Sequence, residues 1–144
     1  MKILAIDYGT KNIGLAYADT ASVLIAQPLT IISNSTSLFE ELSLICQKHK
    51  IEQLILGYPR GLSGQVTQQT RDVQAFGDKL KSSLGLPLQY QDETLSSVHV
   101  REQLSEDKKG NKQKIDDQAA ALILQDYLEQ EIRLHGAALQ NPKD

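Results

Sequence analysis

The chain has 144 residues, of which 40% are hydrophobic and 23% are charged, and its formal net charge is −3. These values are typical of one soluble globular domain with a sizeable core, and they exclude a global basic signal for nucleic acid, although a local basic patch stays compatible with them. The only cysteine, Cys46, excludes an intrachain disulfide and a multi-cysteine zinc site. The first apolar run is too short for a signal peptide or a membrane span, so we expect a cytoplasmic protein.

The N-terminal third of the chain predicts an antiparallel meander of three strands. Residues 2–8 and 13–19 are largely apolar and are joined by a turn that contains Gly9. A third strand, expected over residues 24–32, contains Pro28, which indicates an edge position or a bulge. The links are too short for a parallel crossover, so neighbouring strands are antiparallel.

The middle of the chain alternates helical and extended patterns. The expected elements are a helix over residues 36–49 behind the polar segment 34–37, a strand over 51–56, a helix over 67–84 and a strand over 88–92. Gly57 ends the first of these strands, and Gly85 is the expected C-cap of the second helix. A helix between two strands predicts a parallel crossover.

The C-terminal third of the chain predicts helices only. We expect a helix over residues 95–104, a charged loop over 105–114 and a last helix that opens at Ile115. Residues 134–144 have no pattern and are expected to be a disordered tail. Residues 1–133 are therefore expected to form a single domain.

Acidic residues stand at comparable places in this arrangement. Asp7 ends the first strand, Glu93 and its neighbour Asp92 follow the last strand, and Asp116 is expected in the first turn of the last helix. If the first strand is central in a mixed sheet, these positions can converge. Converging carboxylates repel one another, and a hard divalent cation such as Mg²⁺ removes that repulsion. Such an ion can activate water for hydrolysis of a phosphodiester.

Each of these acids also has a structural interpretation. Asp7 can cap a turn, and Asp92 with Glu93 can be a solvated strand end. Asp116 and Asp117 can stabilise a helix N-terminus through the helix dipole. Spacing alone leaves these interpretations open, and only the shared topological position groups the acids.

Four segments resemble the motifs of the YqgF/RuvX family, in the same order and spacing. They are Asp-Tyr-Gly-Thr-Lys-Asn-Ile-Gly-Leu-Ala over 7–16, Gly57-Tyr-Pro with Gly61 and Gly64, Asp-Glu-Thr-Leu-Ser-Ser over 92–97, and the helix over 115–128 with its Asp-x-x-Ala-Ala core. The resemblance extends from residue 2 to about residue 132. It implies an α/β fold of the RNase H-like type: a mixed five-stranded sheet, with an antiparallel meander and two parallel strands, flanked by helices.

The resemblance also implies an activity. Members of the family are regarded as nucleases for the 5′ end of precursor 16S rRNA, with a site like that of Holliday junction resolvases. Carried across, Asp7, Glu93 and Asp116 would be the catalytic acids and the ligands of Mg²⁺ or Mn²⁺. Asn12 and Thr94 stand where the family has arginines, which grip phosphates with two hydrogen bonds. These departures affect the expected substrate binding more than the expected metal site.

Basic side chains near the predicted site are candidate phosphate contacts. They are Lys11, Arg60, Arg71, Lys108, Lys109, Lys112 and Lys114. The last four form the only basic cluster of the sequence and directly precede Asp116, although a solvated surface loop has the same composition. Tyr8 and Tyr58 are candidates for stacking on bases, with core packing as the alternative.

Several functions remain open at this stage. The expected partner is structured RNA or branched DNA, so a resolvase of DNA junctions and a non-catalytic nucleic-acid-binding module are alternatives to an RNA endonuclease. An Asp-x-Gly-Thr segment after a strand also opens sugar-kinase-like and actin-like ATPases, but those need two domains. We expect no membrane association, and a monomer or weak homodimer.

Overall fold

The computed structural model describes residues 1–59, 67–92 and 112–135. Its elements are β1 (Lys2–Asp7), β2 (Asn12–Asp19), β3 (Val23–Ser33), α1 (Leu38–Lys48), β4 (Gln53–Tyr58), α2 (Gln68–Leu84), β5 (Leu88–Asp92) and α4 (Lys112–His135). The strands and helices expected within the described ranges are all present, but β4 continues through Gly57 to Tyr58, so Gly57 does not end it. The helix expected over 95–104 lies outside the described residues. None of the described helices is long and apolar enough to cross a membrane.

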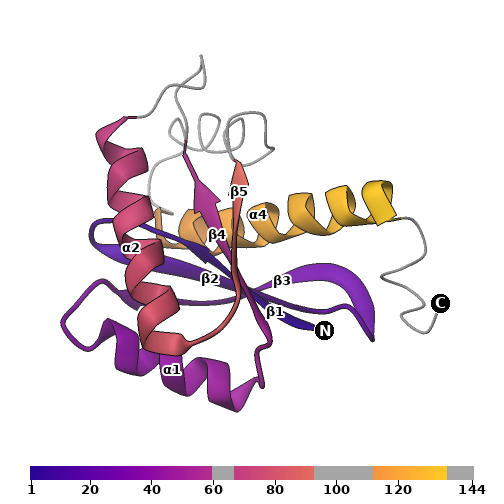
Figure 1. The fold of residues 1–144 in the computed structure, drawn as a ribbon, viewed down its shortest axis with the longest axis horizontal. Coiled ribbons are helices and arrows are strands. Elements are labelled where there is room, and N and C mark those ends of the chain that lie inside the picture. The colour runs from indigo at the N-terminus through magenta and orange to yellow at the C-terminus, as the bar shows by residue number, and fades with distance from the viewer. Residues whose placement is uncertain (60–66, 93–111, 136–144) are drawn as a thin grey trace.

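The five strands form one mixed sheet in the order β3-β2-β1-β4-β5 (Figure 1). β2 is antiparallel to both β1 and β3, whereas β4 is parallel to both β1 and β5. The predicted meander and parallel crossovers are therefore confirmed, and β1 is central, which is the condition under which the acidic residues can converge. Because β1, β4 and β5 run in the same direction, their carboxyl ends lie at the same edge of the sheet.

The edge strand β3 carries an irregularity beside its proline. Leu15 of β2 pairs with Thr30, but the next residue, Ala16, pairs with Pro28, so Leu29 is an extra residue on β3. Proline cannot donate a backbone hydrogen bond to the ladder and is therefore found at edges and bulges. Both features predicted from Pro28 are present.

Helices cover the two faces of the sheet with different side chains. The α1/α2 face is built from large residues, among them Leu4, Ile6, Leu54, Leu56, Leu42, Phe76 and Leu80. The α4 face is rich in alanine and consists mainly of Ile3, Ala5, Ala16, Ala18, Ile55, Ala119, Ala120, Ile123 and Leu124. Figure 1 shows α1 and α2 on one side of the sheet and α4 crossing the other. Cys46 is buried in the α1/α2 core, as predicted.

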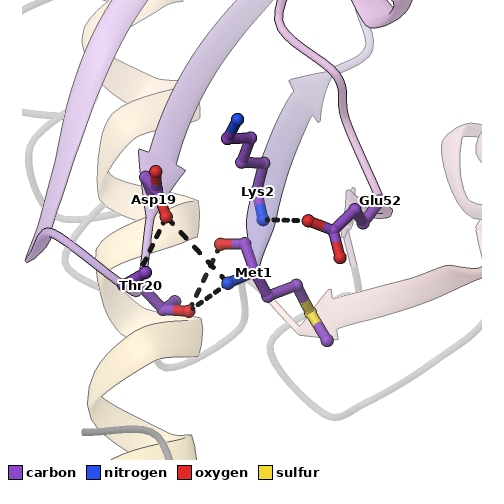
Figure 2. Close-up of polar contacts among 6 residues, drawn as sticks. Met1, Lys2, Asp19, Thr20 and Glu52 are labelled. Atoms are coloured by element: carbon purple, nitrogen blue, oxygen red, sulfur yellow. Dashed lines mark hydrogen bonds and ion pairs between the residues drawn. The ribbon is translucent and has the colours of Figure 1, made fainter.

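The amino end of β1 is closed by a polar network, which Figure 2 shows. The Met1 amino group donates to Thr20 Oγ1 (2.9 Å) and lies 4.0 Å from an Asp19 carboxylate oxygen. The hydroxyl of Thr20 in turn donates to the Met1 carbonyl (3.2 Å). The Lys2 backbone N–H reaches Glu52 Oε1 (3.4 Å), just before β4 begins. These contacts join β1 to its neighbours on both sides at this end.

The boundaries of the last helix differ from those expected. α4 begins at Lys112, so residues 112–114 belong to a helix and not to a loop. Lysine and glutamine are good helix formers, and a charged helical turn can have the same composition as a charged loop. Asp116 consequently lies in the second turn of α4, beyond the first turn in which the helix dipole acts most strongly. The helix continues through His135, two residues into the segment expected to be a tail.

Candidate functional site

Asp7 is the last residue of the central strand β1. It pairs with Gly14 of β2, and it lies one residue past the Ile6–Leu56 pair that joins β1 to β4. Ile3 and Ala5 pack on the α4 face, so the alternation of side chains along a strand places Asp7 on that face too. The residue is half-buried. A carboxylate is thus held at the carboxyl edge of the sheet by a strand with neighbours on both sides.

The end of β5 places two polar residues on opposite faces. Gln91 pairs with Gly57 and Asp92 pairs with Tyr58. Gln91 is therefore level with Asp7 across the parallel strands, and Gly57 between them contributes no side chain. Leu88 packs with the α1/α2 core, so alternation assigns Asp92 to that face and the buried Gln91 to the α4 face.

Asp92, the neighbour of the proposed ligand Glu93, therefore does not share the face of Asp7. Glu93 itself lies outside the described residues. Gln91 is a polar residue of this edge that the sequence pattern did not single out. Its position becomes evident only from the register between β4 and β5.

The beginning of α4 reaches the same edge of the sheet. Gln125 Oε1 accepts a hydrogen bond from the Ala26 backbone N–H (2.9 Å), which fixes the middle of the helix against β3 near the level of Ile3 on β1. Figure 1 shows the first turns of α4 on the side where β4 ends and its last turns on the side of the N-terminus. The first turns of α4, whose backbone includes Asp116, therefore lie toward the edge of the sheet at which β4 ends.

The other predicted contacts are distributed as follows. Lys11 is exposed in the turn after Asp7, and Arg71 is exposed in the first turn of α2. The first turn of α4 includes the backbone of Lys112 and Lys114. Arg60, Lys108 and Lys109 lie outside the described residues, together with Glu93. The structure thus brings Asp7, Lys11 and the start of α4 to one edge of the sheet.

The start of α2 is anchored to the end of β4. Thr67 and Thr70 form a reciprocal capping box, and the Thr70 hydroxyl also donates to the Pro59 carbonyl (2.6 Å). Gln74 Nε2 donates to the Tyr58 hydroxyl (2.9 Å). Arg71 is therefore held near the end of β4, on the α1/α2 face.

The two tyrosines considered for base stacking contribute to packing. The ring of Tyr8 lies 4.5 Å from that of Phe76, centroid to centroid, and Tyr58 meets Tyr90 edge-on at 5.2 Å. Both Tyr8 and Tyr58 are partly buried against the α1/α2 core. The packing interpretation is therefore confirmed for both.

The described part of the chain does not contain a complete set of metal ligands. Among the described side chains, no group of three His, Cys, Asp or Glu residues could hold an ion. Asp7 is the one predicted ligand whose side chain is described. Its carboxylate, half-buried at a strand end, suits a hard divalent cation that prefers oxygen ligands.

The topology and the acid at the end of the central strand define an RNase H-like fold of the resolvase type. The structure of Thermus thermophilus RuvC in complex with a Holliday junction substrate superposes with a TM-score of 0.55 and covers 94% of this chain and 96% of its own, at 13% identity. A likeness at that identity shows the fold alone.

The sequence assigns the family. The RuvX model, described as Holliday junction resolvase, matches residues 1–130. A relative from Maridesulfovibrio salexigens, named "Putative pre-16S rRNA nuclease", is 37% identical over 134 residues, which is 89% of this chain and 98% of the relative. One of the same name from Thermosynechococcus vestitus is 38% identical over 133 residues, 90% of this chain and 88% of the relative. The chain belongs to the RuvX family, and the resemblance seen in its motifs is confirmed.

Proposed function

We propose that the chain is a metal-dependent endonuclease that hydrolyses phosphodiester bonds of structured RNA, and that its task is to process the 5′ end of precursor 16S rRNA in the cytoplasm. Membership of a family described by nuclease activity supports the reaction class, and the names of the curated relatives support the substrate. The single observation that carries the proposal is the position of Asp7 at the carboxyl end of β1, at the sheet edge toward which the first turns of α4, with Asp116, extend.

In this proposal Asp7, Glu93 and Asp116 are the catalytic acids and hold Mg²⁺ or Mn²⁺. All three offer carboxylate oxygens, the ligands these ions prefer. When bound, the metal supplies a more acidic water and stabilises negative charge on the phosphate. For Glu93, support comes from the resemblance of residues 92–97 to the Asp-Glu motif of the family to which the chain belongs.

The chain's own contribution is rigid placement. β1 is paired with β2 up to Asp7 and with β4 up to Ile6, so the Asp7 carboxylate requires little reorganisation when substrate and metal arrive. Lys11 and the basic residues of the first turn of α4, Lys112 and Lys114, would contact phosphates on either side of the cleaved bond. Arg60, Arg71, Lys108 and Lys109 would extend this contact, and binding should weaken steeply with salt.

Two carboxylates at the same sheet edge provide the test. Asp7→Asn keeps the size of the side chain but removes its charge, and it should lower Mg²⁺-dependent cleavage of a precursor 16S RNA about 100-fold or more, because a metal ligand is lost. Asp92→Asn makes the same chemical change on the opposite face and should leave cleavage within about twofold of the unmodified protein. The rates are measured in single-turnover assays on equal amounts of folded protein. Equal activity in the two variants would remove Asp7 from the site.

A DNA substrate is the second candidate, because the family model is described as Holliday junction resolvase and the superposed RuvC was solved with a junction substrate. The same assay on a four-way DNA junction separates the two substrates. A non-catalytic binding module, which Asn12 and Thr94 would suit, predicts RNA binding without metal-dependent cleavage in any form of the protein. We propose a monomer or weak homodimer in all cases, without membrane association.

A further inference from the structure

Asn34 ties the turn that follows Asp7 to the end of β3. Its side-chain Nδ2 donates to the carbonyl oxygen of Gly9 (2.9 Å), across 25 positions of the chain. Its backbone N–H donates to the carbonyl oxygen of Lys11 (2.9 Å). One residue thus holds two carbonyl groups of the turn over residues 8–11.

This use of Asn34 differs from the one that its sequence context indicates. The polar segment 34–37 is expected to cap the next helix, and Ser37 does stand at the N-cap of α1. Asn34 instead directs its amide back to the turn beside Asp7. The amide is half-buried, and a hydrogen bond in a partly desolvated place is costly to leave unmade.

The turn has little freedom at its other positions. A Cβ at Gly9 would overlap the carbonyl oxygen of Asn12, so only glycine allows this close approach of the backbone. The ring of Tyr8 is packed against Phe76. Lys11 is the exposed cation of the turn. The backbone is therefore fixed, and the Lys11 side chain extends from a fixed base.

We propose that Asn34 is a positioning residue for substrate phosphate at the Asp7 edge. A carbonyl oxygen carries partial negative charge and repels phosphate. Because Asn34 holds the carbonyl oxygens of Gly9 and Lys11 toward itself, these two dipoles do not oppose a phosphate at the Lys11 ammonium. This inference rests on the proposed function, since it assigns Asn34 to the binding of the same nucleic acid.

The experiment compares Asn34→Ala, Asn34→Asp and Ser35→Ala. Alanine removes the bond to Gly9 but keeps the backbone bond to Lys11, and aspartate replaces the donor by an anion that accepts only. Ser35→Ala is the matched control. It removes a side-chain hydrogen bond, to Ser37, from the residue that directly follows Asn34. Two quantities are measured: amide hydrogen exchange at residues 9–11 by NMR without RNA or metal, and KM and kcat on the precursor 16S RNA.

We expect faster exchange confined to residues 9–11 in both Asn34 variants and no change in Ser35→Ala. KM should rise roughly fivefold in Asn34→Ala, as for loss of one hydrogen bond, and tenfold or more in Asn34→Asp, with kcat changed less than twofold. Unchanged exchange in Asn34→Ala, or an unchanged KM with faster exchange, overturns the inference. If the unmodified protein cleaves no RNA, the proposed function fails by itself. In that case faster amide exchange at residues 9–11 in Asn34→Ala still supports the role of Asn34 in holding the turn, which we call the clamp by Asn34, and unchanged exchange overturns it.

Discussion

The two faces of the sheet are packed by different means, although the same five strands supply both. The α1/α2 face meets its helices with leucine, isoleucine and phenylalanine, whereas the α4 face meets its helix largely with alanine. Small side chains allow a helix to approach a sheet closely, and large side chains keep it further away. The close face is the one on which Asp7 lies and against which the helix with Asp116 packs. We therefore expect the α1/α2 face mainly to supply stability and the α4 face to set the relation between the two candidate ligands.

The largest effect on stability is expected on the α1/α2 face. Leu56 is fully buried there, and Leu56→Ala should lower the free energy of unfolding by about 2–5 kcal/mol, because it removes packed methyl groups and leaves a cavity. Urea unfolding measures the loss. Cleavage per folded molecule should stay nearly normal at low temperature. A large loss of activity in protein that is still folded would contradict the separation of the two faces.

A smaller loss of stability with a larger loss of activity is expected on the α4 face. Ala120 is fully buried, and Ala120→Leu should cost about 1–3 kcal/mol, because added volume in a tight contact pushes α4 from the sheet. Cleavage per folded molecule should fall at least tenfold, since a misplacement of about 1 Å can cost a factor of 100. Ala75→Leu adds the same side chain to an exposed position of α2 and serves as the control. If Ala120→Leu cleaves RNA as fast as Ala75→Leu, the packing of α4 on its face of the sheet does not position the proposed catalytic site.

The smallest effect at neutral pH concerns Cys46 on the α1/α2 face. Burial raises the pKa of its thiol to about 11. The folded state thus favours the neutral thiol. This contribution to stability is fully present below the ordinary thiol pKa near 8.5 and is lost as the pH rises toward 11.

Cys46→Ala should therefore remove part of the fall in unfolding free energy between pH 8 and pH 10.5. The two tyrosines with raised pKa values, Tyr90 and Tyr127, are unchanged in that comparison. The native thiol should also react slowly with iodoacetamide at pH 8 and quickly once the protein is unfolded. Equally fast alkylation of the native protein would show that the thiol is accessible and its pKa ordinary.

The sheet was predictable because its signals are local. Apolar runs and glycines located the strands, and Pro28 indicated an edge position or a bulge, both of which β3 has. The start of α4 was misplaced because residues 112–114 are all polar and so lack the apolar period that marks a helix.

The site was predictable in part. The position of Asp7 at the end of a central strand followed from the apolar run before it. Glu93 and Asp116 were grouped with it by their topological positions, and the resemblance assigned their roles. The alignment of Gln91 with Asp7 and the clamp by Asn34 depend on contacts between distant segments, which no local pattern encodes. Asn34 in particular belongs to a polar segment typical of a helix N-cap, so its sequence context indicated the backbone of the next helix as its partner.

The extra residue on β3 has a consequence for self-association. An exposed edge strand offers a regular row of donors and acceptors that a second chain can extend into a larger sheet. At Pro28 that row lacks a donor, and at Leu29 its spacing is broken. An incoming strand would have to match the same irregularity, which ordinary extended segments do not carry. The outer edge of β3 is thereby a poor template for fibrils.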